Sequence, residues 1–133
     1  MKRLVGSLAS IAALLALTAP ASPDTMARVR GRVMDAITNA PIAAKISVRD
    51  SGGRTVSLKT DSHGRFAAVG FSPGNVTVSF AADGFVSQGR TCRVPPGETG
   101  RFDFRGYHDY VAASRLKYSC SIEPPTVDRS LIQ

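Results

Sequence analysis

One of the chain's two histidines lies in a run whose residue types could support hydrolytic chemistry. The run Asp61-Ser62-His63 contains the three residue types of a hydrolase triad. However, Gly follows directly, and Asp at the start of a turn commonly accepts hydrogen bonds from backbone N–H groups further along. Turn chemistry alone therefore accounts for these residues. We expect Asp61 to cap its own turn and His63 to be exposed.

The second histidine lies in the run Tyr107-His108-Asp109-Tyr110, whose tyrosine and histidine side chains can bind metals. Adjacent strand residues point to opposite faces, so Tyr107 and His108 would diverge in an extended segment. No H-x-H pair and no phosphate-binding G-x-x-x-x-G-K-[ST] motif occurs in the sequence. We therefore predict no catalytic residues, no metal site and no cofactor, and we interpret Tyr107, His108 and Tyr110 as a candidate binding surface.

Arginine gives the chain its basic character, with 17 Lys and Arg against 10 Asp and Glu in 133 residues. Arg28, Arg30 and Arg32 alternate along one predicted strand, so they share a face. Guanidinium groups bind carboxylates and phosphates through paired hydrogen bonds, which makes this face a second candidate binding surface. A solvated, edge-protecting sheet face is the simpler alternative. Four more arginines follow later in the sequence: Arg90, Arg93, Arg101 and Arg105.

The first 21 residues have the pattern of a cleavable secretory signal peptide. Lys2 and Arg3 precede an apolar stretch from Leu4 to Leu17, and small residues surround Pro20. The stretch falls short of the roughly 20 apolar residues of a spanning helix, and no later segment is apolar enough. We therefore predict a signal-peptide helix at 1–21, a flexible leader at 22–27, and an exported, periplasmic or secreted product without a membrane span.

Cys92 and Cys120 are the only cysteines. In an oxidising compartment an unpaired cysteine is a liability, so we predict a disulfide between them. Closing a loop of this span stabilises a fold by about 3–4 kcal/mol in the chain-entropy model. Two separate buried thiols are the alternative.

Short runs of alternating apolar and polar residues, separated by Gly, Pro and Asp turns, predict an all-β fold. The expected architecture is an antiparallel, seven-stranded β-sandwich over residues 28–107. The predicted strands are Arg28–Met34, Ala44–Arg49, Thr55–Thr60, Arg65–Phe71, Val76–Phe80, Phe85–Val94 and Arg101–Tyr107. The predicted core consists of Val33, Ile46, Val48, Val56, Leu58, Phe66, Val76, Val78, Phe80, Phe85, Phe102 and Phe104.

The C-terminal extension, residues 108–133, is less regular. The segment Tyr110–Ser121 fits an extra strand that holds Cys120 near Cys92, and a short helix over Val111–Leu116 fits almost as well. Pro124 and Pro125 end any regular element, and the last residues are expected to fray.

The order of the turn motifs resembles that of the carboxypeptidase regulatory-like domains, which have a transthyretin-like β-sandwich. The strand at Gly31–Asp35 leads through a turn with Pro41 into a second strand, as in that family. Three later segments are similar to the family's T-D-x-x-G-x-F, L-x-P-G-x-Y-x-V and A-x-G-[FY] turns: Thr60–Phe66, Phe71–Val78 and Ala82–Phe85. The resemblance covers Arg30 to about Phe104 and implies a binding scaffold rather than a reaction.

Two enzyme groups with related sandwiches provide a test of catalytic function. Transthyretin-related hydroxyisourate hydrolases have a His where this chain has Arg32, and their C-terminal Y-R-G-S is missing. Arginine stays protonated and cannot act as a general base near neutral pH. Intradiol dioxygenases hold iron with two Tyr and two His, which the separated His63 and His108 do not reproduce. A hydrolase or another enzyme is therefore the least favoured alternative.

These observations predict an exported, non-catalytic binding or accessory module. The expected partner is a protein of the bacterial envelope, contacted through a sheet edge or the Tyr107–Tyr110 loop, or an anionic polysaccharide. No nucleic acid is expected for an exported chain. A carbohydrate-binding module is the alternative, although the chain has no Trp. The aromatic side chains that could form a sugar platform are Tyr107, Tyr110, Tyr118 and Phe71.

Overall fold

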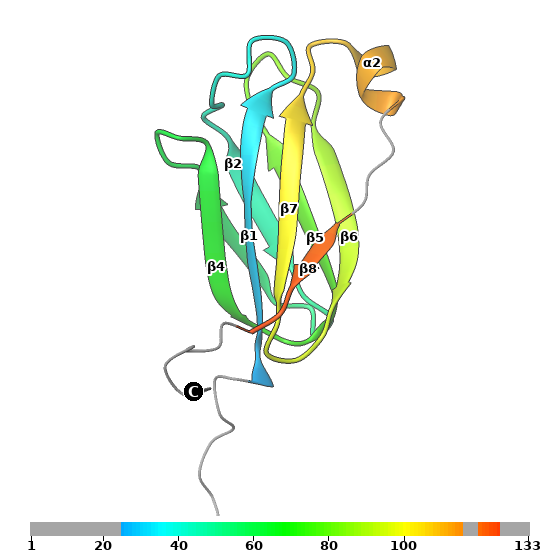
Figure 1. The fold of residues 1–133 in the computed structure, drawn as a ribbon. Coiled ribbons are helices and arrows are strands. Elements are labelled where there is room, and N and C mark those ends of the chain that lie inside the picture. Colours follow the sequence, from blue (N-terminus) through cyan, green and yellow to red (C-terminus); the bar gives the residue numbers. More distant parts are fainter. Residues whose placement is uncertain (1–24, 116–119, 126–133) are drawn as a thin grey trace, which may run out of the picture.

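The computed structural model describes residues 25–115 and 120–125, in which eight strands form two sheets packed face to face (Figure 1). The predicted signal peptide, most of the leader and the last residues of the extension lie outside this range. No helix in the described part is long and apolar enough to cross a membrane. The strands are β1 (Ala27–Asp35), β2 (Lys45–Arg49), β3 (Thr55–Lys59), β4 (Arg65–Phe71), β5 (Gly74–Ala81), β6 (Gln88–Val94), β7 (Thr99–Gly106) and β8 (Ser121–Glu123).

The two sheets have the strand orders β4-β1-β7-β8 and β3-β2-β5-β6. All pairs are antiparallel except β1 with β7, which run parallel. The parallel pair departs from the predicted all-antiparallel sandwich. It arises because the turn before β7 crosses to the first sheet at the end where β1 begins, with Arg28 N donating to Glu98 O at 3.1 Å. The eighth strand, β8, also goes beyond the seven predicted strands.

Glycine permits the close contact of β1 with its neighbours at the centre of the first sheet. A Cβ on Gly31 would lie 1.7 Å from the backbone oxygen of Phe102 and 2.8 Å from the Phe66 ring. Backbone atoms cannot rotate away as a flexible side chain can, so only glycine fits. A different requirement applies at Gly64, where φ is +73°, a conformation that other residues rarely adopt.

Alternation along the strands places the core between the sheets, as predicted. The largest fully buried side chains include Phe80 and Phe104, whose rings lie 5.1 Å apart across the interface between the sheets. Val56, Leu58 and Phe85 are only partly buried against this core, so the prediction overstated their burial. Buried hydrophobic residues that the prediction omitted are Ala27, Val29, Ile42, Ala44, Phe71, Cys92, Val94 and Ala113.

The side chain of Phe71 is completely buried. The prediction that Phe71 could form part of an exposed sugar-binding platform was therefore wrong. Strict alternation from Phe66 would send it outward. The β1–β4 register shifts between Ala27 and Arg28, and Gly70 has a φ of +85°. This bulge adds one residue to the alternation and turns Phe71 inward.

Side chains from β6 close the side of the sandwich nearest β7 and β8. Cys92 forms the predicted disulfide with Cys120, with their Cα atoms 6.1 Å apart. The Gln88 side chain donates to the Arg105 carbonyl at 2.7 Å, and the Arg90 guanidinium lies 4.6 Å from the centroid of the Phe104 ring. Arg90 therefore points inward and does not share an outer face with the other arginines.

The C-terminal extension forms a short helix close to the predicted Val111–Leu116, and its strand begins at the end of the predicted segment Tyr110–Ser121 instead of occupying it. A one-turn helix, α2 (Tyr110–Ser114), begins after Asp109, whose side chain accepts from Val111 N. The strand β8 follows Cys120 and pairs with β7. Ile122 on β8 packs against the core. The disulfide and this contact together hold β8 at the edge of the first sheet.

Asp50, the one buried charged residue in the described chain, ties two turns together at one end of the sandwich. Its carboxylate accepts hydrogen bonds from the backbone N–H groups of Gly52, Arg54 and Ser72 at 2.9–3.0 Å. Burial alone would raise the pKa of Asp50, but these three donors outweigh it and hold the pKa below its ordinary value. Asp50 therefore acts as an ionised clamp between the β2–β3 turn and the β4–β5 connection.

Candidate binding surfaces

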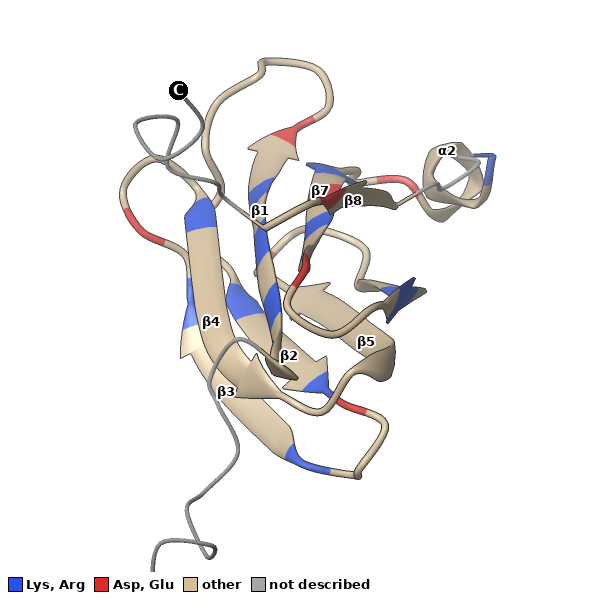
Figure 2. Cartoon of the chain, turned by 60° about the horizontal axis from the view of Figure 1, so that its bottom comes forward, with Lys and Arg blue, Asp and Glu red and all other residues tan. Residues whose placement is uncertain are grey.

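The outer surface of the sheet β4-β1-β7-β8 is here called the arginine face. Three neighbouring strands, β4, β1 and β7, carry basic residues, whose positions are blue in Figure 2. Alternation along β1 places Arg28, Arg30 and Arg32 there together, opposite the buried Val29 and Val33. The register places three further arginines on the same face: Arg65 on β4, and Arg101 and Arg105 on β7.

A shallow groove crosses this face. Four arginines line it: Arg30, Arg32, Arg65 and Arg101. Small residues form part of its lining, because Gly31 has no side chain and Ala67 lies directly opposite Arg30 on β4. Asp61 contributes the one carboxylate that lines it. The groove is therefore open to solvent and carries a net positive charge.

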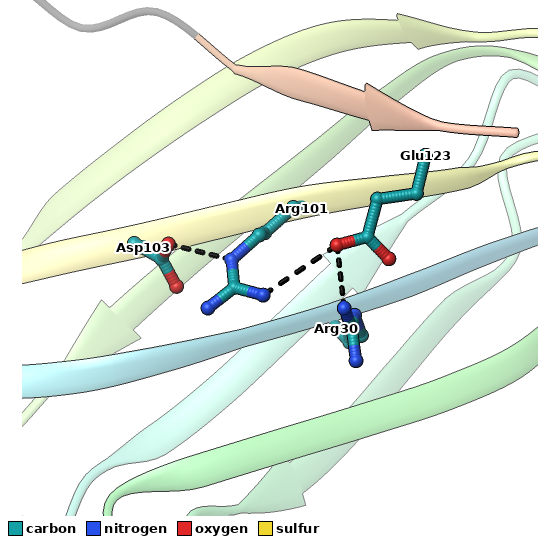
Figure 3. Close-up of polar contacts among 4 residues, drawn as sticks. All are labelled: Arg30, Arg101, Asp103 and Glu123. Atoms are coloured by element: carbon teal, nitrogen blue, oxygen red, sulfur yellow. Dashed lines mark hydrogen bonds and ion pairs between the residues drawn. The ribbon is translucent and has the colours of Figure 1, made fainter.

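Glu123 shows how a carboxylate binds at this groove (Figure 3). Its Oε1 accepts from Arg30 at 2.5 Å and lies 3.5 Å from the Arg101 guanidinium. Arg101 also donates to Asp103 at 2.8 Å. The hydrogen bond from Arg30 is the main reason that the pKa of Glu123 lies below its usual value, and Asp103 is the main reason that the pKa of Arg101 is raised.

Arg32 and Arg65 differ from Arg30 and Arg101, because neither forms an ion pair within the described residues. They are direct partners in the β1–β4 register. Like charges directly opposite one another destabilise an antiparallel pair. The nearby Asp61 already accepts two backbone hydrogen bonds and compensates only in part. Arg32 and Arg65 thus present two charges at a cost to the fold, and both remain available to an anion.

The run Asp61-Ser62-His63 forms a turn, as predicted. Asp61 Oδ1 accepts from the backbone N–H groups of His63 and Arg65 at 2.8 and 2.9 Å, and His63 is exposed. The hydrogen bond from Arg65 N is the largest cause of the lowered pKa of Asp61. The carboxylate is therefore oriented toward its own backbone.

His108 joins three segments at the end of the sandwich where β1 ends. Its ring packs on Phe85 with centroids 4.2 Å apart, its Nδ1 contacts the Gly84 carbonyl, and its Nε2 lies 3.8 Å from Asp35. Asp35 accepts from Ile37 N and Thr38 N, and these bonds, with a smaller effect of His108, lower its pKa. His108 is thus held by contacts within the fold.

The two tyrosines of this run have different environments. Tyr107 is partly buried and its carbonyl accepts from Val86 N, whereas Tyr110 is 73% exposed on α2. The structure therefore brings Tyr107 and His108 to one loop but leaves only Tyr110 freely presented. Tyr118, a predicted sugar-platform residue, lies outside the described residues.

The sequence interpretation did not single out Arg65 or Glu123. For Arg65 a signal existed, since it alternates with the core residue Phe66, but its position beside Arg32 depends on pairing between distant strands. Glu123 lies only three residues after Cys120, so the disulfide was the available clue. Arg93, grouped with Arg101 in the sequence, belongs to the other sheet.

The two packed sheets and the turn geometry define a β-sandwich scaffold. The sequence profile of the carboxypeptidase regulatory-like domain matches residues 28–105, which is more than half of the chain. The chain therefore belongs to the carboxypeptidase regulatory-like domain family. A comparison with curated proteins gives no match.

Two solved structures are similar to the chain at low sequence identity. One is a candidate carbohydrate-binding protein from Bacteroides uniformis, with 19% identity and a TM-score of 0.48 over 64% of this chain and 42% of that one. Another is the dioxygenase domain of a dioxygenase–carbohydrate-binding fusion from Streptomyces sp. SirexAA-E, with 17% identity and a TM-score of 0.48 over 67% and 84% of the two chains. The chain thus spans less than half of the first protein.

Proposed function

We propose that this protein is an exported, non-catalytic binding module that recognises an acidic segment of another envelope protein through the arginine face. The observation that carries the proposal is the groove formed by Arg30, Arg32, Arg65 and Arg101. Three strands must pair in register to bring these four side chains together. The resulting surface fits carboxylates, which guanidinium groups bind in defined geometry.

The choice of a protein partner rests on the internal contact made by Glu123. This residue is a peptide carboxylate presented by an extended strand, and it binds Arg30 and Arg101 at one end of the groove. Arg32 and Arg65 form no such pair within the described residues. An acidic segment that crossed the groove from β1 toward β4 would therefore reach these two cations.

Two features support a non-catalytic, exported module. The carboxylates and imidazole that might serve as acid or base are engaged by the fold, since Asp61 accepts backbone hydrogen bonds and His108 contacts Gly84 and Asp35. The Cys92–Cys120 disulfide fits an oxidising compartment, as does the predicted signal peptide. We assign the module to the bacterial periplasm or the secreted fraction on these grounds.

A labelled decapeptide of alternating Glu and Thr tests the proposal by fluorescence anisotropy. Arg32→Gln/Arg65→Gln should weaken binding about fivefold to tenfold, the effect of two exposed ion pairs. The matched control is Lys45→Gln/Lys59→Gln on the opposite sheet, which removes the same charge and should change the affinity less than about twofold. Equal losses in both variants, or no binding by the wild-type protein, would contradict the proposal.

A further inference from the structure

The outer surface of the other sheet, β3-β2-β5-β6, is here called the hydroxyl face. Its strand registers align a row of small residues across all four strands. The row consists of Ser57, Ser47, Ser79 and Gly89. Neighbouring strands lie about 4.8 Å apart, so the row runs about 14 Å across the sheet. A groove runs along one side of this row, between the serines and the neighbouring pair Lys45 and Lys59.

The rows beside the serine row combine cations with further hydroxyl groups. On one side Lys45 lies directly opposite Lys59. On the other side Arg49 pairs with Thr77, whose hydroxyl is 2.7 Å from that of Thr91. Residues two apart on a strand are about 7 Å apart, so the row with Arg49 lies about 14 Å from the Lys45–Lys59 pair, on the far side of the serine row.

No Asp or Glu occurs in any of the four strands of this sheet. Figure 2 shows the contrast, with no acidic colour on β2, β3 or β5. Protection of a sheet edge would explain Lys59 on the edge strand β3, but not Lys45 and Arg49 on the interior strand β2. The Lys45–Lys59 pair also repels across the strands. The face therefore keeps a purely cationic charge that the fold does not need.

From this charge and this groove we infer that the hydroxyl face binds an acidic polysaccharide. Serine and threonine hydroxyls both donate and accept hydrogen bonds, which suits sugar hydroxyl groups. The ammonium groups of Lys45 and Lys59 would pair with uronate carboxylates. No aromatic side chain lies outward on this face among the described residues, so a neutral sugar would lack a stacking platform.

A membrane surface fits this face less well. The large hydrophobic side chains exposed in the described chain are Ile37, Val69, Tyr110 and Val111, and none of them lies on the strands of this sheet. Headgroup binding without apolar insertion would rely on charge alone. The inference goes beyond the proposed function, because the two outer faces of one sandwich would then hold two different partners.

Polygalacturonate and its fully methyl-esterified form test the inference, since esterification removes the carboxylate charge and keeps the sugar backbone. Binding is measured by biolayer interferometry at 50 and 300 mM NaCl. We expect the acidic polymer to bind, the ester to bind at least tenfold more weakly, and the higher salt to weaken the acidic complex. Equal binding of the two polymers, or binding to neither, would overturn the inference.

Variants then locate the site. Lys45→Gln/Lys59→Gln should weaken polygalacturonate binding about fivefold to tenfold, whereas the charge-matched Arg32→Gln/Arg65→Gln should change it less than about twofold. Ser57→Glu places a carboxylate at the exposed end of the serine row. It should weaken polygalacturonate binding by repulsion, although both lysines are kept. Equal losses in the two double variants would mean that the net charge, and not this face, binds the polymer.

The same two double variants separate this inference from the proposed function. The acidic peptide should respond to Arg32 and Arg65, and the polysaccharide to Lys45 and Lys59. If the wild-type protein binds polygalacturonate but not the peptide, only the arginine face is refuted. If it binds the peptide but not polygalacturonate, only the hydroxyl face is refuted.

Discussion

Replacing Asp50 with asparagine should destabilise the fold by about 2–3 kcal/mol at pH 7, the effect of losing one charge-assisted hydrogen bond and weakening two others. Asp50 Oδ1 accepts from Gly52 and Arg54, and Oδ2 accepts from Ser72. Asparagine has one carbonyl oxygen, so it can keep the first pair only by directing its NH₂ group toward the Ser72 N–H. That arrangement leaves two donors facing each other in a buried position.

The pH dependence gives this prediction a second test. Because the folded pKa of Asp50 is below the ordinary value of 3.8, its ionised form contributes stability that is fully present above the unfolded pKa. That stability is lost as the pH falls through the folded pKa. Wild-type protein should therefore lose more stability than Asp50→Asn as the pH falls below about 5, and the difference between the two proteins should shrink. Other titrating carboxylates occur in both proteins and cancel.

Urea denaturation followed by far-ultraviolet circular dichroism measures both effects, with unfolding free energies extrapolated linearly at pH 7, 4 and 3. Asp83→Asn, in an exposed turn, is the control and should change the unfolding free energy by less than about 0.5 kcal/mol. The reasoning is refuted if Asp50→Asn matches this control at pH 7, or if the gap to the wild-type protein widens as the pH falls.

Three further predictions concern the disulfide, the groove and the sheet centre. Replacing Cys92 and Cys120, which are 28 residues apart, with alanine should lower the unfolding free energy in urea by about 3–4 kcal/mol, and a change under 1 kcal/mol would contradict it. Glu123→Gln should raise the affinity for the acidic peptide about twofold to fivefold in the anisotropy assay, because it frees Arg30 and leaves Arg101 paired with Asp103 alone; a weaker affinity would argue against competition for the groove. Gly31→Ala should cost at least about 3 kcal/mol or prevent folding, which thermal unfolding and soluble yield would detect, because the added Cβ meets backbone atoms.

Local patterns in the sequence were enough to predict the first seven strands and the disulfide. Alternation alone separates Arg30 from Val29, and two cysteines allow only one intramolecular pairing. The β1–β7 pairing was not accessible in this way, because it joins segments more than 60 residues apart and depends on which sheet β7 enters. The predicted antiparallel arrangement was wrong for that pair.

The candidate sites depended even more on distant pairing. The sequence placed Arg28, Arg30 and Arg32 on one face but could not place Arg65 beside them, since that needs the β1–β4 register. In the sequence Asp50 is typical of a turn residue, because the third group that donates to its carboxylate, the N–H of Ser72, lies 22 positions away. The aligned serine row likewise exists only once four strands are in register.

The most direct test of the arginine face is an amide chemical-shift map of the ¹⁵N-labelled protein titrated with the acidic peptide. The account predicts saturable shifts that cluster on β1, β4 and β7, around Arg30–Arg32, Arg65–Ala67 and Arg101. It also predicts that the amide chemical shifts of the strands in the opposite sheet remain unchanged. Shifts centred on that sheet or on the Tyr107–Tyr110 loop, or no shifts at saturating peptide, would contradict it.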